Sequence, residues 1–153
     1  MAPTTRWFED IKEGQSAEFG DYLMTEAEII EFASKYDPQP FHIDPEAAKT
    51  SFFGGLIASG WHTMAALMRM LVDNSISRES ALGSPGVDEL RWLKPVRPGD
   101  RLRARSTVVK TVRSRSKPDR GTVYNFTEVL NQKGEVVMTL KGMGMFRCRP
   151  DSE

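Results

Sequence analysis

The sequence predicts an α+β fold in which a curled antiparallel sheet wraps around one long buried helix. The first observation behind this prediction is a nearly continuous apolar stretch, residues 56–72, with the length and composition of a core helix. The second is a series of alternating, β-rich segments that begins near Gly86 and is separated by turn residues. A helix that is apolar on almost every side must be covered, and a sheet beside it provides that cover.

The N-terminal part predicts one strand and one clear helix. Residues 16–24 alternate loosely and are expected to form the strand. Thr25 and Glu28 have the spacing of a capping box, in which each side chain binds the free backbone N–H of the other. We therefore expect a helix from Thr25 that ends at Asp37-Pro38, because proline disfavours helical geometry in the residue before it.

A proline-bounded stretch, residues 38–41, follows and is expected to be extended rather than helical. Each proline fixes its own φ and pushes the preceding residue toward extended geometry. Asp37 and His42, five residues apart, are thus expected on a stiff loop. Asp44 and Pro45 then start a short helix, since aspartate is a good N-cap and proline suits the first helical position.

The central helix is expected from Ser59 or Gly60 to Asp73, and four strands follow it. The expected strands are residues 86–93, 101–112, 122–130 and 135–146. Gln132-Lys133-Gly134 has the composition of a hairpin turn between the last two.

Length and composition indicate a single soluble globular domain over residues 1–153. The 21 basic and 21 acidic residues balance, so nothing points to nucleic acid or an anionic membrane. The apolar run contains His62 and Arg69 and is short for a membrane span. Cys148 is the lone cysteine and the N-terminus lacks an apolar segment, so we expect a cytoplasmic location without a signal peptide.

An acid, an imidazole and a helix N-terminus occur within one short stretch, at Asp37, His42 and Gly60. These are the parts of a proton-transfer site. Taken alone, Asp37 would be interpreted as a turn residue and His42 as a structural imidazole. His42 and Asp44 are too few to hold a metal, so no metal is expected.

With these residues in view, the chain resembles the MaoC-like hydratase/dehydratase family, which has the hot-dog fold and includes the (R)-specific enoyl-CoA hydratases. The family motif is Asp, two residues, Pro, one residue and His, followed by a glycine at the start of the central helix. Here residues 37–42 read DPQPFH, and Gly60 follows. Residues 86–100 also resemble the family, and the similarity extends from about Trp7 to Phe146.

Three positions depart from the family pattern. Gln39 stands where Asn is common, and Ser59 stands where many members have His. A serine further along the helix, which contacts the catalytic aspartate in some members, is replaced by Met68.

The resemblance implies (R)-specific hydration of trans-2-enoyl-CoA, or dehydration of 3-hydroxyacyl thioesters. Asp37 and His42 would bind one water, with Asp37 accepting its proton and His42 delivering a proton to Cα. The backbone N–H of Gly60 would stabilise the thioester oxyanion. No metal or redox cofactor is implied, since coenzyme A is part of the substrate.

The resemblance also suggests residues around the substrate. The substrate-binding candidates are Phe41, Ser59, Trp61, Met64 and Met68. The candidates for the coenzyme A phosphates are Lys94, Arg97, Arg101, Arg103 and Arg105. The arginine run could instead be a solvated strand face, and the methionines core or interface rather than acyl tunnel. For His62 we favour packing over a place in the pocket.

The family pairs two units into a continuous sheet, so we expect a homodimer or a dimer of dimers that acts on coenzyme A or acyl carrier protein thioesters. Two alternatives stay open. One is a hot-dog thioesterase, and the other is a non-catalytic acyl-thioester-binding subunit.

Overall fold

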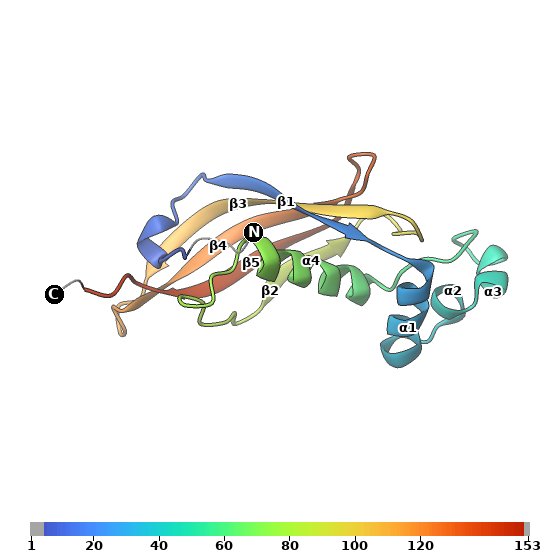
Figure 1. Ribbon diagram of the computed structural model, residues 1–153, viewed down its shortest axis with the longest axis horizontal. Coiled ribbons are helices and arrows are strands. Elements are labelled where there is room, and N and C mark those ends of the chain that lie inside the picture. The colour runs from blue at the N-terminus through green and yellow to red at the C-terminus, as the bar shows by residue number, and fades with distance from the viewer. Residues whose placement is uncertain (1–4, 152–153) are drawn as a thin grey trace.

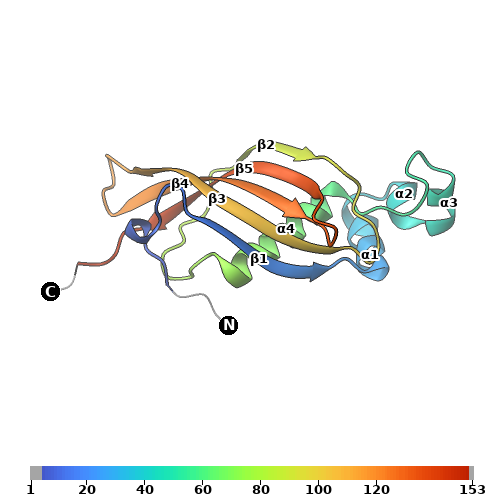
Figure 2. The same ribbon diagram turned by 90° about the horizontal axis from the view of Figure 1, so that it is seen from above.

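The computed structural model describes residues 5–151, in which a five-stranded antiparallel sheet curls around one long helix (Figures 1 and 2). In chain order the elements are η1 (Phe8–Asp10), β1 (Ser16–Leu23), α1 (Glu26–Tyr36), α2 (Pro40–Ile43), α3 (Pro45–Lys49), α4 (Gly60–Asn74), β2 (Val87–Trp92), β3 (Arg101–Arg113), β4 (Arg120–Leu130) and β5 (Val136–Arg147). The strand order is β1-β3-β4-β5-β2, with every neighbouring pair antiparallel. The predicted α+β layout and all five expected strands are thus confirmed.

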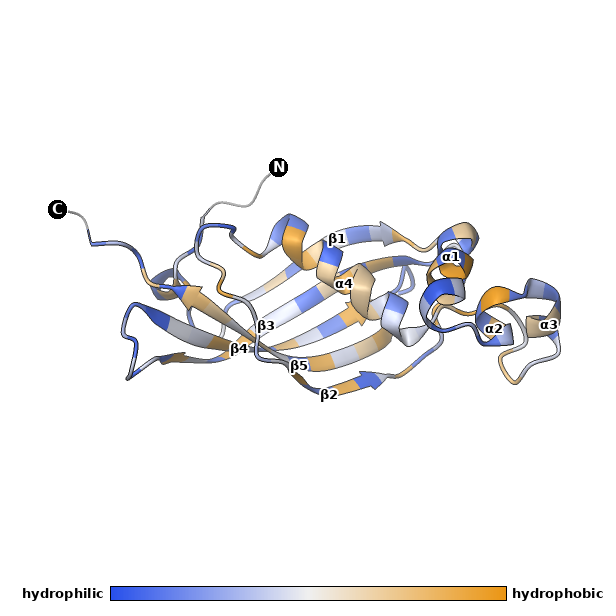
Figure 3. Ribbon diagram, turned by 90° about the horizontal axis from the view of Figure 1, so that it is seen from below, coloured by the Kyte–Doolittle hydropathy of each residue, from blue (hydrophilic) through white to orange (hydrophobic). Residues whose placement is uncertain are grey.

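Helix α4 lies across the concave face of the sheet, while α1, α2 and α3 project from one end (Figure 3). Leu67 and Met70 of α4 pack in the same core as Ala104 of β3 and Met138 of β5. At Gly20 of β1 a side chain would lie 2.8 Å from Cγ of Met70, so a glycine there lets the strand approach the helix. The buried face of α4 therefore fixes the helix against the sheet.

The opposite face of α4 is open in the single chain, which corrects the expectation of a helix buried on nearly all sides. Trp61 is 60% exposed, and Met68 and Val72 are each 43% exposed. The physical reason is that one sheet covers one side of a helix only. The apolar residues on the other side need a further partner or a ligand to be covered.

Two local predictions about the N-terminal helices need correction. Thr25 caps α1 as expected, because its hydroxyl accepts the Glu28 N–H at 3.2 Å. The Glu28 carboxylate does not return to the cap, however, but contacts Tyr22 and His62. Residues 38–41 are not extended throughout, since α2 begins at Pro40, where a proline's fixed φ suits the first helical position.

Asp44 caps α3 as predicted, and its carboxylate accepts the N–H groups of Glu46 and Ala47. Within residues 5–151, no helix is both long and apolar enough to cross a membrane.

Candidate active site

Asp37 and His42 meet at the junction of the N-terminal helices with α4. Asp37 is the C-cap of α1, and His42 lies in the single turn of α2, where it is buried. Their side chains are in direct contact, with 3.2 Å between His42 Nε2 and Asp37 Oδ2. The one-turn helix thus brings together the two groups that the sequence motif singled out.

The second ring nitrogen of His42 defines the proton arrangement. Nδ1 lies 2.8 Å from the backbone carbonyl oxygen of Ile57. A carbonyl only accepts hydrogen bonds, so Nδ1 carries a proton and Nε2 faces the Asp37 carboxylate. The contact between Nε2 and the Asp37 carboxylate is favourable when a proton lies between the two atoms. The geometry therefore allows His42 and Asp37 to share one proton.

Asp37 receives two more hydrogen bonds. The Ser59 hydroxyl donates to Oδ2 at 2.8 Å, and the Gln39 amide donates to Oδ1 at 2.7 Å. Burial on its own would raise the pKa of Asp37. The hydrogen bonds from Gln39 and Ser59 and the charge of His42 outweigh burial and lower that pKa. Asp37 is therefore held as an ionised acceptor.

Gly60 is the first residue of α4, directly after the N-cap Ser59, so its N–H lies at the positive end of the helix dipole. Trp92 of β2 covers it and donates its indole N–H to the Gly60 carbonyl at 3.0 Å. A Cβ at Gly60 would lie only 2.6 Å from the indole nitrogen. The glycine is thus required by the close approach of Trp92, a reason that the sequence did not reveal.

The predicted substrate-binding residues separate into two groups. Phe41 and Trp61 flank the site, with the Phe41 ring 4.5 Å from the His42 ring and Trp61 edge-on to Trp92. Ser59 is completely buried, and its hydroxyl is engaged with Asp37 and the Trp61 N–H. In this structure the Ser59 hydroxyl therefore supports Asp37, and contact of Ser59 with substrate stays a prediction.

Met64 and Met68 line an apolar groove of 330 Å³ that runs along the exposed side of α4. Leu71 and Val72 continue the same wall, and residues 142–146 of β5 form the opposite one. Met64 is one helical turn past Gly60, but neither Asp37 nor His42 lines the groove itself.

The cationic candidates are also divided by the structure. Leu102 and Ala104 of β3 are fully buried in the core, so the alternating arginines lie on the other face of the sheet. Their partners there are Asp21 for Arg101, Glu18 for Arg103, and Glu128 and Glu18 for Arg105. These ion pairs agree with the interpretation of this run as a solvated strand face, and a role of the arginines in phosphate binding stays a prediction.

Arg97 and Lys94 lie on the segment after β2. The Arg97 guanidinium donates to the Phe53 carbonyl at 2.7 Å, beside the loop that leads into α4. Lys94 pairs with Glu135. Of the five cationic side chains predicted to bind phosphate, Arg97 is the one that hydrogen-bonds to the loop before α4.

A partly buried polar cluster joins α1 to α4 and was missed by sequence reasoning. His62 Nε2 lies 3.0 Å from Glu28 Oε1, and the Tyr22 hydroxyl donates to the same oxygen. The His62 ring stacks on Phe32 with 4.8 Å between centroids, which confirms that it packs. Burial and the hydrogen bond to Glu28 raise the pKa of Tyr22 to about 12. The spacing of Thr25 and Glu28 predicted that the Glu28 side chain caps α1, so its contacts with Tyr22 and His62 were not expected.

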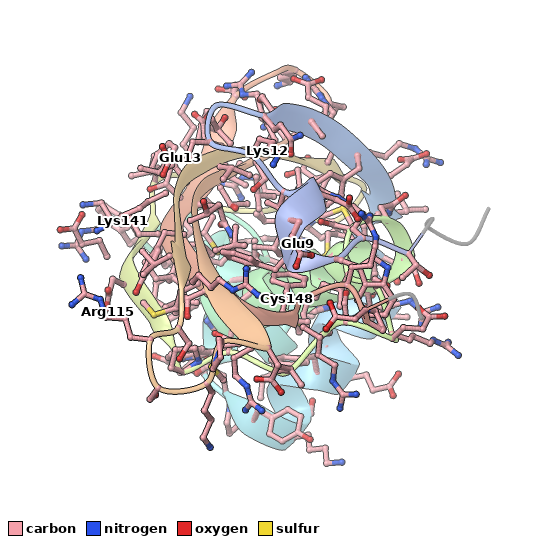
Figure 4. The ribbon with its side chains drawn as sticks, turned by 90° about the vertical axis from the view of Figure 1, so that its left-hand side faces the viewer. Glu9, Lys12, Glu13, Arg115, Lys141 and Cys148 are labelled. Atoms are coloured by element: carbon pink, nitrogen blue, oxygen red, sulfur yellow. The ribbon has the colours of Figure 1, made fainter. Side chains whose placement is uncertain are left out.

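Cys148 is buried near Glu9 at the end of the sheet opposite the α1–α3 projection (Figure 4). It therefore has no part in the Asp37 site. Within residues 5–151, no three His, Cys, Asp or Glu side chains gather as a potential metal site.

A single antiparallel sheet wrapped around one helix defines a hot-dog-fold domain, and here an acid–imidazole pair lies at the N-terminus of that helix. The chain belongs to the MaoC-like domain family, whose model matches residues 10–130.

The relatives support this assignment. A MaoC-like dehydratase from Rhodospirillum rubrum superimposes with a TM-score of 0.89 at 41% identity, covering 96% of this chain and 100% of that one. An (R)-specific enoyl-CoA hydratase of the same organism is 33% identical over 111 residues, 69% of this chain and 72% of the relative. A Mycobacterium tuberculosis protein described as a double hot-dog fold matches with a TM-score of 0.78 at 15% identity, over 97% of this chain and 46% of its own. The predicted family and fold are thus confirmed.

Proposed function

We propose that this protein is an (R)-specific enoyl-CoA hydratase, or the same enzyme operating in reverse as a 3-hydroxyacyl-thioester dehydratase. The observation that carries the proposal is the 3.2 Å contact between His42 and Asp37 next to the first N–H of α4. The relative named as an (R)-specific enoyl-CoA hydratase adds support.

In this proposal the Asp37 carboxylate removes a proton from water while the water oxygen bonds to Cβ of the enoyl thioester. Electron density moves to the thioester oxygen, where the Gly60 N–H stabilises it. The doubly protonated His42 ring then donates the Nε2 proton to Cα. The contact between Asp37 and His42 lets the proton on Asp37 return to Nε2, so the net change is the addition of one water.

The thioester oxygen is proposed to lie at the Gly60 N–H, on the side that Trp92 does not cover, with the acyl chain directed toward the groove lined by Met64 and Met68. The carrier is coenzyme A or acyl carrier protein, and Arg97 is the cation best placed for its phosphates. The proposed reaction needs no cofactor beyond the thioester itself.

We also propose a homodimer. The open face of α4 and the outer strand β2 expose large apolar side chains, which include Trp61, Val72, Val87 and Trp92. A second copy would cover this surface and close the groove beside the site.

The proposed activity is tested by following the loss of the conjugated thioester absorbance with crotonyl-CoA and longer enoyl-CoAs. We expect turnover by the wild type, and a loss of about 10²–10⁴-fold in kcat for Asp37→Asn, since that is the usual contribution of a general base. Chiral analysis of the 3-hydroxyacyl product should give the (R) form. Absence of turnover at every chain length, or full activity of Asp37→Asn, would refute the proposal.

A thiol-trapping reaction run on the same samples separates hydration from thioester hydrolysis. A hydratase leaves the thioester intact and releases no free thiol, whereas a thioesterase releases one thiol for each substrate consumed.

A further inference from the structure

Ser59 connects the two halves of the site through one hydroxyl group. Its Oγ accepts the Trp61 N–H at 3.3 Å as the N-cap of α4, and donates to Asp37 Oδ2 at 2.8 Å. An N–H can only donate, so the single hydroxyl proton of Ser59 is free for the carboxylate. The direction of this bond is therefore determined by the helix terminus.

The oxygen that Ser59 holds is the one that faces the imidazole. Asp37 Oδ2 contacts both the Ser59 hydroxyl and His42 Nε2, while Oδ1 is bound by the Gln39 amide. The carboxylate is thus held by donors on both of its oxygens.

The supports of Asp37 differ in rigidity. Ser59 has 0% exposure, whereas Gln39 lies on the surface. A buried side chain has little rotational freedom, so Ser59 places the carboxylate more firmly than an exposed glutamine does. Since Ser59 directly precedes Gly60, the same residue sets the position of the base relative to the Gly60 N–H.

We infer that Ser59 is a positioning residue that holds Asp37 ionised and oriented toward substrate, at a fixed place relative to the Gly60 amide. This inference rests on the proposed hydratase function. Ser59 acts through Asp37 and does not itself touch substrate. The lowered pKa of Asp37 agrees with the hydrogen bonds that it receives.

The role of Ser59 as a helix cap can be separated from its role toward Asp37 by the choice of substitution. Glycine is nearly as good an N-cap as serine, so Ser59→Gly removes the hydroxyl at little cost to α4. Ser59→Ala removes both the cap and the hydroxyl, and Ser59→Thr restores a hydroxyl at the same place.

We expect Ser59→Gly to remain folded, with a melting temperature that falls only as far as the lost hydrogen bond to Asp37 requires. Its kcat should fall at least about tenfold because the carboxylate is no longer fixed. The acid limb of its kcat/KM profile should move up by about one to two pH units, the size expected for a lost hydrogen bond to a charged group. Ser59→Thr should move the limb back toward the wild-type position.

A Ser59→Gly enzyme with wild-type kcat and a wild-type acid limb would overturn the inference. An NMR titration of the Asp37 carboxyl carbon, in wild type and in Ser59→Gly, measures the effect of the Ser59 hydrogen bond on the pKa of Asp37 and needs no enzymatic activity. If the wild type fails to hydrate any enoyl-CoA, the proposed function fails, and this titration still decides whether Ser59 governs the ionisation of Asp37. An unshifted titration in Ser59→Gly would refute the contact itself.

Discussion

At the scale of single residues, the environment of Asp37 makes its charge a source of stability as well as of reactivity. The pKa of a carboxyl held below its ordinary value stabilises the fold at every pH above the unfolded-state pKa, about 3.9 for aspartate. This contribution is lost as the pH falls through the lower pKa of the folded state.

We therefore predict that Asp37→Asn destabilises the protein at neutral pH by about 1–2 kcal/mol, the size expected when hydrogen bonds to a charged group are weakened. This difference should shrink as the pH falls through the lowered pKa of Asp37. Urea unfolding of wild type and variant at several pH values measures it. Asp21→Asn is the matched control, because Asp21 is an exposed partner of Arg101 and should contribute little at any pH. A difference that stays constant down to low pH would contradict the prediction.

Sequence reasoning found Asp37 and His42 because they are five residues apart on a segment with its own signals. It did not find the Ser59 bond to Asp37, 22 residues away, or the Glu28 contact with His62, 34 residues away. Those contacts depend on how α1 packs against α4, which no local pattern specifies. The sequence placed Ser59 at the start of the central helix, but no local pattern showed that its hydroxyl would bind Asp37.

At the scale of elements, the strands were predictable because period-two alternation and turn residues determine them locally. Helix α2 could not be predicted in the same way, because Pro38 and Pro40 together indicate an extended chain. In the structure Pro40 is the first residue of α2, a position that suits proline. The sequence correctly placed the arginines on one face of β3. It did not show whether that face would be covered or open to solvent, because this depends on which side of the sheet α4 packs against.

The junction of α4 with β2 gives a second prediction. Gly60→Ala should destabilise the protein by about 1–3 kcal/mol, because the new methyl group overlaps the Trp92 indole. In Gly60→Ala/Trp92→Val the overlap is removed, so the loss should be smaller than the sum of the two single losses. Thermal unfolding of the four proteins measures this coupling.

Gly55→Ala is the control for that cycle, because its nearest neighbour is the end of the flexible Arg97 side chain at 3.3 Å. It should change stability little. Strictly additive losses in the Gly60 and Trp92 pair would show that the indole does not restrict the glycine.

The link between α1 and α4 gives a third prediction. Glu28→Leu leaves buried His62 without its partner, which should cost about 1–3 kcal/mol of stability. Because α1 ends at Asp37, kcat should fall as well, and the pKa of Tyr22 should drop from about 12 toward its ordinary value. Absorbance titration of the phenol measures that drop.

Glu31→Leu, an exposed substitution on the same helix, is the control for Glu28. It should leave the Tyr22 titration unchanged. An unaltered Tyr22 titration in Glu28→Leu would contradict the hydrogen bond between them.

At the scale of the whole molecule, the arrangement leaves one large surface without a cover. The N-terminal helices project beyond one end of the sheet, and α4 faces outward along its length (Figures 1 and 3). Strand β2, which also exposes apolar side chains, is an outer strand whose free edge can pair with another strand. Hydrophobic surface of this kind is typical of an interface between subunits.

The proposed dimer can be tested on this surface with a pair of valines. Val87 lies on β2 within the apolar surface, whereas Val109 lies on β3 outside it, and they are 43% and 60% exposed. Val87→Glu should weaken association because a buried carboxylate at the interface would lack a partner, whereas Val109→Glu should have no effect. Light scattering after size-exclusion chromatography, over a range of protein concentrations, measures the mass of each. A wild type that stays monomeric at every concentration would refute the proposed dimer. Equal effects of the two glutamates would show that β2 lies outside the interface.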